Sequence, residues 1–182
     1  MARIEYADPS AGPARDLATR IIAERGSLLH LYRMLLHSPP VAAGWLEYLS
    51  AIRHHTRLDA AVREMIIIRI AHLNRAPYEA DQHIPIALRA GIGAEQIASL
   101  AQPVPDETLF DRRQQAVLAY TDAMTRDIQV PDAVFGAVHA QFPEDQVVEL
   151  TATIAAYNMV SRFLEALQVH TSDTPQDPPV HG

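Results

Sequence analysis

Apolar residues recur at three- and four-residue spacing along most of this chain, a pattern that favours helices. The segment 28–36 shows this spacing and is followed by Pro39-Pro40, which predicts a stop. A second segment, 60–74, is apolar almost all round at its centre, so we expect it to form a central, buried helix. Apolar β-branched residues with period-two alternation, which would indicate strands, are missing. The sequence therefore predicts an all-α fold.

Proline and glycine mark further helix boundaries. Pro77 is expected at the first position of a helix that continues to Arg89, where Gly91 supplies the stop. Other helices are expected over 45–52, 94–101, 109–126, 131–142 and 146–168. The length of 182 residues favours one domain. We expect an N-terminal extension over 1–13, a helical domain over 14–170 and a flexible, proline-containing tail over 171–182.

Composition excludes several classes of function. All fifteen basic residues are arginine and the formal net charge is −7 without a basic block, so nucleic-acid binding is not expected. The absence of cysteine excludes disulfides and thiol chemistry. No apolar run is long enough to span a bilayer, and the first ten residues lack the apolar core of a secretory signal. We therefore expect no membrane partner and a cytoplasmic location.

The candidate chemistry lies between Glu64 and His83. Glu79 and His83 are four residues apart in one expected helix, hence on one face. Glu64 belongs to the preceding apolar helix, and a turn at Pro77 would bring its carboxylate back toward that face. A buried carboxylate beside an imidazole forms a general acid/base pair.

Each of these residues also has a purely structural interpretation. Glu79 falls at the third helical position, where a carboxylate is favoured by capping and by the helix dipole. His83 could form a surface pair with it, worth about 0.2–0.5 kcal/mol. Glu64 could be solvated beside Arg63. The residue types alone do not decide between these interpretations and a catalytic site.

A metal site is the weaker alternative. His72, Glu79 and His83 offer two nitrogens and an oxygen of the kind that zinc or iron accepts. Pro77 interrupts the helix between the first and the second of them, so they need not converge. We expect no metal and no cofactor.

The segment Glu64–Gly91 resembles the carboxymuconolactone decarboxylase and alkylhydroperoxidase-D superfamily. Its peroxidase branch carries E-x11-C-x2-C-x3-H, and the same spacing from Glu64 reaches Ala76, Glu79 and His83. Both cysteine positions are thus replaced, which places the chain with the Cys-less decarboxylase branch. That branch commonly reads Y/F-E-W before the histidine; here the triplet is Tyr78-Glu79-Ala80. The resemblance covers about residues 28–101.

The resemblance implies an alkylhydroperoxidase-D-like helical bundle that assembles as a homotrimer or homohexamer. It also implies cofactor-free decarboxylation of a carboxylated muconolactone in aromatic-acid breakdown. His83 would be the acid/base, Glu79 would set its tautomer, and Glu64 would assist proton transfer. Arg69 or Arg75 would bind a substrate carboxylate, although a solvated arginine is the alternative for either, and Tyr78 would contact the small-molecule substrate.

Two other functions remain open at this stage. The chain could be an oligomeric ligand-binding protein that keeps the fold without the chemistry. It could also be a peroxidase, but the absence of cysteine counts strongly against that function, because the thiolate is the redox nucleophile.

Overall fold

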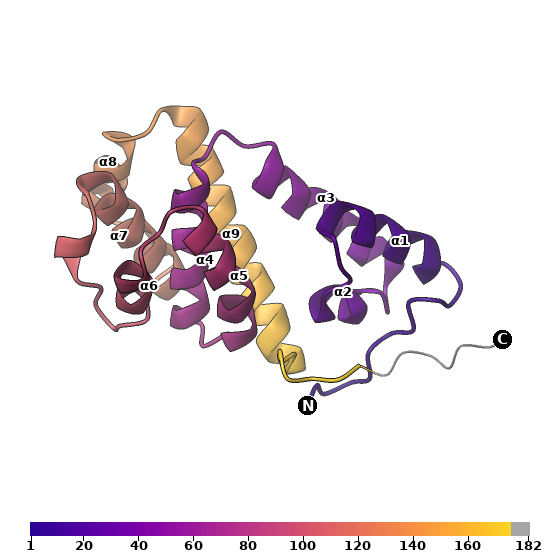
Figure 1. Cartoon of the computed structure of the whole chain (residues 1–182). Coiled ribbons are helices and arrows are strands. Elements are labelled where there is room, and N and C mark those ends of the chain that lie inside the picture. The colour runs from indigo at the N-terminus through magenta and orange to yellow at the C-terminus, as the bar shows by residue number, and fades with distance from the viewer. Residues whose placement is uncertain (176–182) are drawn as a thin grey trace. The chain divides into compact units, whose positions relative to one another are not determined.

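The computed structural model describes residues 1–175, and these contain helices and no strands (Figure 1). The predicted all-α fold is confirmed for this part of the chain. The helices are α1 (Ala14–Arg25), α2 (His30–Leu35), α3 (Pro39–His54), α4 (Ala60–Leu73), α5 (Pro77–Arg89), α6 (Ala94–Leu100), α7 (Arg112–Arg126), α8 (Asp132–His139) and α9 (Glu144–Leu167), with a 3-10 turn, η1, at Glu107–Leu109.

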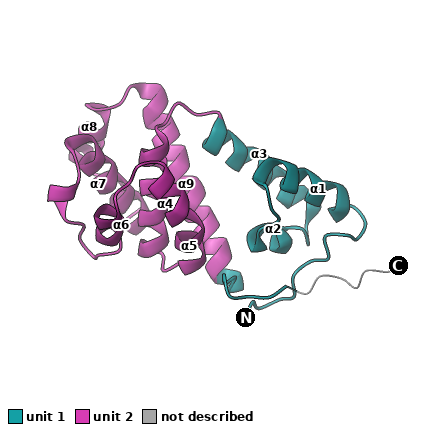
Figure 2. Ribbon diagram, viewed as in Figure 1, with its two compact units in different colours: residues 1–54, 166–182 teal, residues 55–165 magenta. Residues whose placement is uncertain are grey.

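The chain divides into two compact units, coloured separately in Figure 2. The first contains residues 1–54 and the segment from 166 onward, and the second contains residues 55–165. The helical domain predicted over 14–170 thus spans parts of both units. No helix within residues 1–175 has the length and apolar character needed to cross a bilayer.

The first unit holds α1 to α3 together with the two ends of the described chain. Tyr6 donates a hydrogen bond to the Asp173 carboxylate at 2.7 Å, and His30 bonds the backbone carbonyl of His170 at 3.0 Å. Asp173, in the expected flexible tail, therefore contacts the N-terminal segment, whereas residues 176–182 lie outside the described residues. Pro39 does not simply end the preceding helix: it is the first residue of α3, consistent with its preference for the first helical turn.

The second unit is built around α4, which contacts α5, α6 and α7. As predicted, α4 is the buried helix: Met65, Ile66, Ile67 and Ile68 are all at most 1% exposed. Asp59 begins it by accepting hydrogen bonds from the backbone N–H groups of the second and third helical residues, an arrangement worth about 1 kcal/mol.

Proline and glycine act at α5 as the sequence predicts. Pro77 is its first residue, and Gly91 after its end has a φ of 96°, which glycine adopts without strain. Between α4 and α5 the chain turns within three residues, and this short turn returns α5 alongside α4. The turn positions the candidate site, because the two helices carry Glu64, Glu79 and His83.

A buried polar cluster ties this turn to α9. Asn74, which ends α4, donates to the side-chain oxygens of Asn158 at 2.9 Å and Ser161 at 2.6 Å. Asn158 in turn donates to the Thr125 hydroxyl of α7 at 3.0 Å. Polar groups removed from water are stable only when bonded in this way, so the cluster fixes α4, α7 and α9 against one another.

Candidate active site

His83 and Glu64 form the centre of the candidate site. His83 Nδ1 lies 2.6 Å from Glu64 Oε2, and the two residues come from α5 and α4. The Glu64 side chain is fully buried and that of His83 is 10% exposed. An ionised carboxylate only accepts hydrogen bonds, so with Glu64 ionised the imidazole carries a proton on Nδ1, and Nε2 is the nitrogen left for proton exchange.

Two further residues contact this pair. Arg63 Nε donates to the other oxygen of Glu64, Oε1, at 3.3 Å, and its side chain is largely buried. Glu64 is therefore neither unpaired nor solvated beside Arg63. Tyr157 of α9 presents its ring edge-on to the imidazole, with ring centroids 5.3 Å apart and an interplanar angle of 89°. Tyr157 lies in an apolar periodic run that is typical of core packing, so the sequence around it gives no sign of this contact.

Glu79 differs from both sequence-based interpretations. It lies on α5 and is 2% exposed, but neither carboxyl oxygen has a hydrogen-bond partner among residues 1–175. It therefore neither caps the helix nor holds the His83 ring; Glu64 holds the ring instead. Burial raises the pKa of Glu79 well above its ordinary value of 4.5, because a low-dielectric environment disfavours the charged form. Burial thus favours the protonated, neutral form of Glu79.

The prediction that Arg69 binds a substrate carboxylate is wrong. Its side chain is 1% exposed, and its guanidinium makes five hydrogen bonds inside the protein. Two go to the Asp122 carboxylate and three to backbone carbonyls, those of Leu100, Gln102 and Pro103. A guanidinium has five N–H donors, so none is left for a ligand. Arg69 is neither a substrate arginine nor a solvated one.

Arg75 and Tyr78 lie at the start of α5. Arg75 is exposed in the α4–α5 turn and has a φ of 55°, whereas Tyr78 is 4% exposed. Among the three residues expected to bind substrate, Arg75 therefore keeps a guanidinium that a ligand in solution can reach.

His72 does not form the alternative metal site. Within the described part of the chain, no group of three or more His, Asp or Glu side chains is placed to hold a metal ion. Burial, together with the charge of Arg69, lowers the pKa of His72 below 6.5, so this imidazole is neutral at pH 7.

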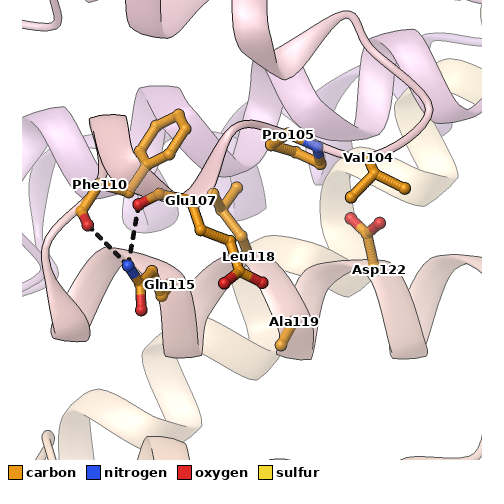
Figure 3. A pocket seen from close by; sticks show the side chains of 8 residues that line it. All are labelled: Val104, Pro105, Glu107, Phe110, Gln115, Leu118, Ala119 and Asp122. Carbon is orange, nitrogen blue, oxygen red and sulfur yellow. Dashed lines mark hydrogen bonds between the residues drawn. The ribbon is translucent and has the colours of Figure 1, made fainter.

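A cavity of about 170 Å³ lies where the segment 103–110 crosses α7 (Figure 3). Gln115 secures that segment by donating to the backbone carbonyls of Glu107 and Phe110, each at 2.9 Å, and Asp122 lines the other end. None of the predicted site residues lines this cavity. Asp122 also binds Arg69 of α4. The cavity therefore lies next to the contact that joins α4 to the segment 103–110.

The segment that carries the His–Glu pair also resembles a known family. Residues 39–125, which contain Glu64, Glu79 and His83, match the model of the carboxymuconolactone decarboxylase family.

Known proteins with a similar sequence or fold extend the likeness beyond that segment. The uncharacterised protein YnjA of Escherichia coli K12 is 28% identical over 128 residues, 69% of this chain and 66% of its own length. A peroxidase-related protein of Ralstonia eutropha JMP134 with an alkylhydroperoxidase AhpD core has a TM-score of 0.81 at 19% identity, covering 96% of this chain and 98% of its own. A variant of the debrominase Bmp8, solved with 2,3,4-tribromopyrrole, has a TM-score of 0.77 at 15% identity, covering 95% and 93%. The fold is therefore alkylhydroperoxidase-D-like.

Proposed function

We propose that this chain is a cofactor-free lyase that transfers a proton during decarboxylation of an unsaturated lactone or a related carboxylate. The observation that carries the proposal is the 2.6 Å contact between His83 Nδ1 and the buried Glu64 carboxylate. An imidazole oriented by a carboxylate can both deliver and accept a proton near neutral pH. The match of residues 39–125 to the family model supports this reaction class, and the absence of cysteine counts against the peroxidase alternative.

The chemical step needs an acid and a sink for electrons. When the carboxylate leaves as CO2, the electron pair of the broken C–C bond passes into the unsaturated lactone and gives a dienolate. His83, protonated on both nitrogens, gives its Nε2 proton to carbon and regains a proton from water. Glu64 stabilises the charged ring before that transfer, because the carboxylate stays hydrogen-bonded to Nδ1.

Glu79 has a distinct role in this proposal. A carboxyl group that remains protonated at pH 7 is a hydrogen-bond donor. In the dienolate, negative charge develops on the lactone carbonyl oxygen, and a donor aimed at that oxygen lowers the barrier. We assign this donation to Glu79, whose two oxygens have no partner in the described structure. Arg75 and Tyr78 are the candidates for holding the rest of the substrate, with Arg75 bound to a carboxylate that is retained.

A substrate screen tests the proposal. Metal-free protein is mixed with a panel of carboxylated and uncarboxylated unsaturated lactones, while CO2 release and ultraviolet absorbance are recorded. We expect turnover of a carboxylated member that is unaffected by a chelator. Saturable binding of several members without turnover of any would contradict the lyase function and favour the alternative, an oligomeric ligand-binding member of the family.

A further inference from the structure

The outer face of α9 carries an apolar stripe that water reaches. The stripe is made of Val148, Ala152, Ala155 and Met159, which follow one another at spacings of four, three and four residues. Val148 is 67% exposed and Met159 is 38% exposed; Ala155 is exposed and Ala152 half-buried. A solvent-facing line of a helix is normally polar or charged, yet all four of these positions are apolar.

The stripe lies beside an open groove. The groove has a volume of about 630 Å³, and its lining includes Val148, Ala152 and Ala155 from α9 together with Phe135 of α8. Phe135 is 43% exposed and stacks on His139 at an interplanar angle of 15°. The small alanine side chains at the middle of the stripe allow another helix to approach closely.

Charged residues flank the stripe at both ends, and their signs are opposite. Asp145 lies three residues before Val148 and Arg162 lies three residues after Met159, so both continue the same line along the helix. Asp145 is 51% exposed, and its contact among residues 1–175 is an exposed ion pair with Arg57 at 3.4 Å, a kind that contributes little. Arg162 is exposed and is held along α9 by bonds from Nη1 to the backbone and side-chain oxygens of Asn158.

Two copies of the stripe are complementary when the second runs in the opposite direction. If a second α9 lies antiparallel to the first and centred on the same point, Ala152 of each helix faces Ala155 of the other. The same alignment places Val148 opposite Met159 and Asp145 opposite Arg162. A parallel alignment would instead place Asp145 against Asp145 and Arg162 against Arg162. The antiparallel arrangement buries every apolar member and forms two ion pairs across about 26 Å of helix.

We propose that this stripe is the surface on which a second copy of the chain docks, with the two α9 helices antiparallel about a two-fold axis between Ala152 and Ala155. Because the same patch is used on both copies, the contact closes in pairs. The assembly therefore contains an even number of chains. Of the two assemblies implied by the family resemblance, the hexamer is compatible with this contact, whereas three chains cannot all satisfy it.

The first experiment measures mass at equilibrium by sedimentation for the full chain. Wild type is expected as a dimer or a higher even assembly at micromolar concentration. Ala155→Arg places two arginines at the axis and is expected to weaken the pairing by about 100-fold or more, because charges are buried without partners. Ala98→Arg, at an exposed alanine of α6, is the matched control and should leave the mass unchanged. A monomeric wild type, or an unchanged mass for Ala155→Arg, would overturn the proposal.

The second experiment tests the antiparallel alignment. Asp145→Arg and Arg162→Asp should each weaken the pairing by placing like charges opposite one another, and the double exchange should restore it. A double variant that pairs more weakly than both single variants would contradict the alignment.

A third experiment detects the pairing directly, by cross-linking, and does not depend on weakening the assembly. In this cysteine-free chain, Ala152→Cys combined with Ala155→Cys should give a dimer held by two disulfides after mild oxidation. Ala98→Cys, the control, should give little disulfide-linked dimer. Absence of the covalent dimer from a folded double variant would also overturn the proposal.

Discussion

His83 Nδ1 lies 2.6 Å from Oε2 of Glu64, although nineteen residues separate the two along the chain. The contact exists because the α4–α5 turn returns α5 along α4 within three residues. The Asn74 cluster holds that turn against α9, the helix that also carries the Tyr157 ring against His83. The α4–α5 turn and the packing of α9 therefore hold Glu64 and His83 next to each other.

Glu64→Gln should lower turnover by about 10–100-fold, because a neutral amide stabilises the charged imidazole less than a carboxylate does. Activity that depends on the protonated ring is lost as pH rises, and in the variant this loss should occur at lower pH than in wild type. The measurement is the pH dependence of kcat/KM. Glu95→Gln, at an exposed carboxyl of α6, is the control and should match wild type; an unchanged profile for Glu64→Gln would count against the pair.

Glu79→Gln should remove a loss of folding stability that wild type shows as pH rises. The pKa of Glu79 is raised in the folded state, so between about pH 4.5 and that higher value the folded chain binds more protons than the unfolded one. In wild type, the contribution of Glu79 to the free energy of unfolding is fully present below pH 4.5. Above pH 4.5 this contribution falls by at most about 1.4 kcal/mol per pH unit. Glutamine removes this dependence.

Urea unfolding of wild type and Glu79→Gln from pH 5 to 8 measures the effect. The stability difference in favour of the variant should grow with pH, whereas Glu95→Gln should show no such trend. A constant difference across the range would mean that Glu79 is charged in the folded protein.

Arg69→Met should destabilise the fold by about 3–5 kcal/mol, because it removes the buried guanidinium that donates to Asp122 and to three backbone carbonyls. Arg75→Met, at an exposed position, should change stability by less than about 0.5 kcal/mol. If Arg75 binds a substrate carboxylate, its replacement should raise KM. Denaturant unfolding and steady-state kinetics together separate the two arginines, and equal losses of stability would contradict their assignment.

Reduction of alkyl hydroperoxides should not occur. The peroxidase spacing places Ala76 and Glu79 where that branch has its cysteines, so wild type has no thiol to attack the peroxide. The assay uses metal-free protein, a dithiol reductant and an alkyl hydroperoxide. Turnover above the protein-free rate would show that a peroxide chemistry independent of cysteine operates here.

The helices were predictable because their signals are local. Apolar spacing marks α4, and Pro77 and Gly91 mark the ends of α5. The helix α1 was not predicted: its buried residues are only two alanines and one isoleucine, too few to give a clear apolar spacing. The start of the helix expected over 109–126 was also misplaced, since Asp111 caps α7 after the 3-10 turn.

The site was predictable in its members but not in its pairing. Spacing of four residues puts Glu79 and His83 on one face of a helix, yet it does not say which side chain binds which. Tertiary packing supplied Glu64 as the partner instead. Arg69 shows a signal that could have been used: a charged residue inside a helix that is apolar all round must be paired. Its partner, Asp122, lies 53 residues further along the chain, beyond any local pattern.

The proposed role of His83 as proton donor can be measured by the kcat of His83→Asn on a substrate found in the lactone screen. Asparagine keeps a polar side chain of similar shape but cannot carry the proton. We expect kcat to fall by about 10²–10⁴-fold, with the fold and assembly intact by circular dichroism and sedimentation. Turnover at the wild-type rate by folded His83→Asn would contradict it.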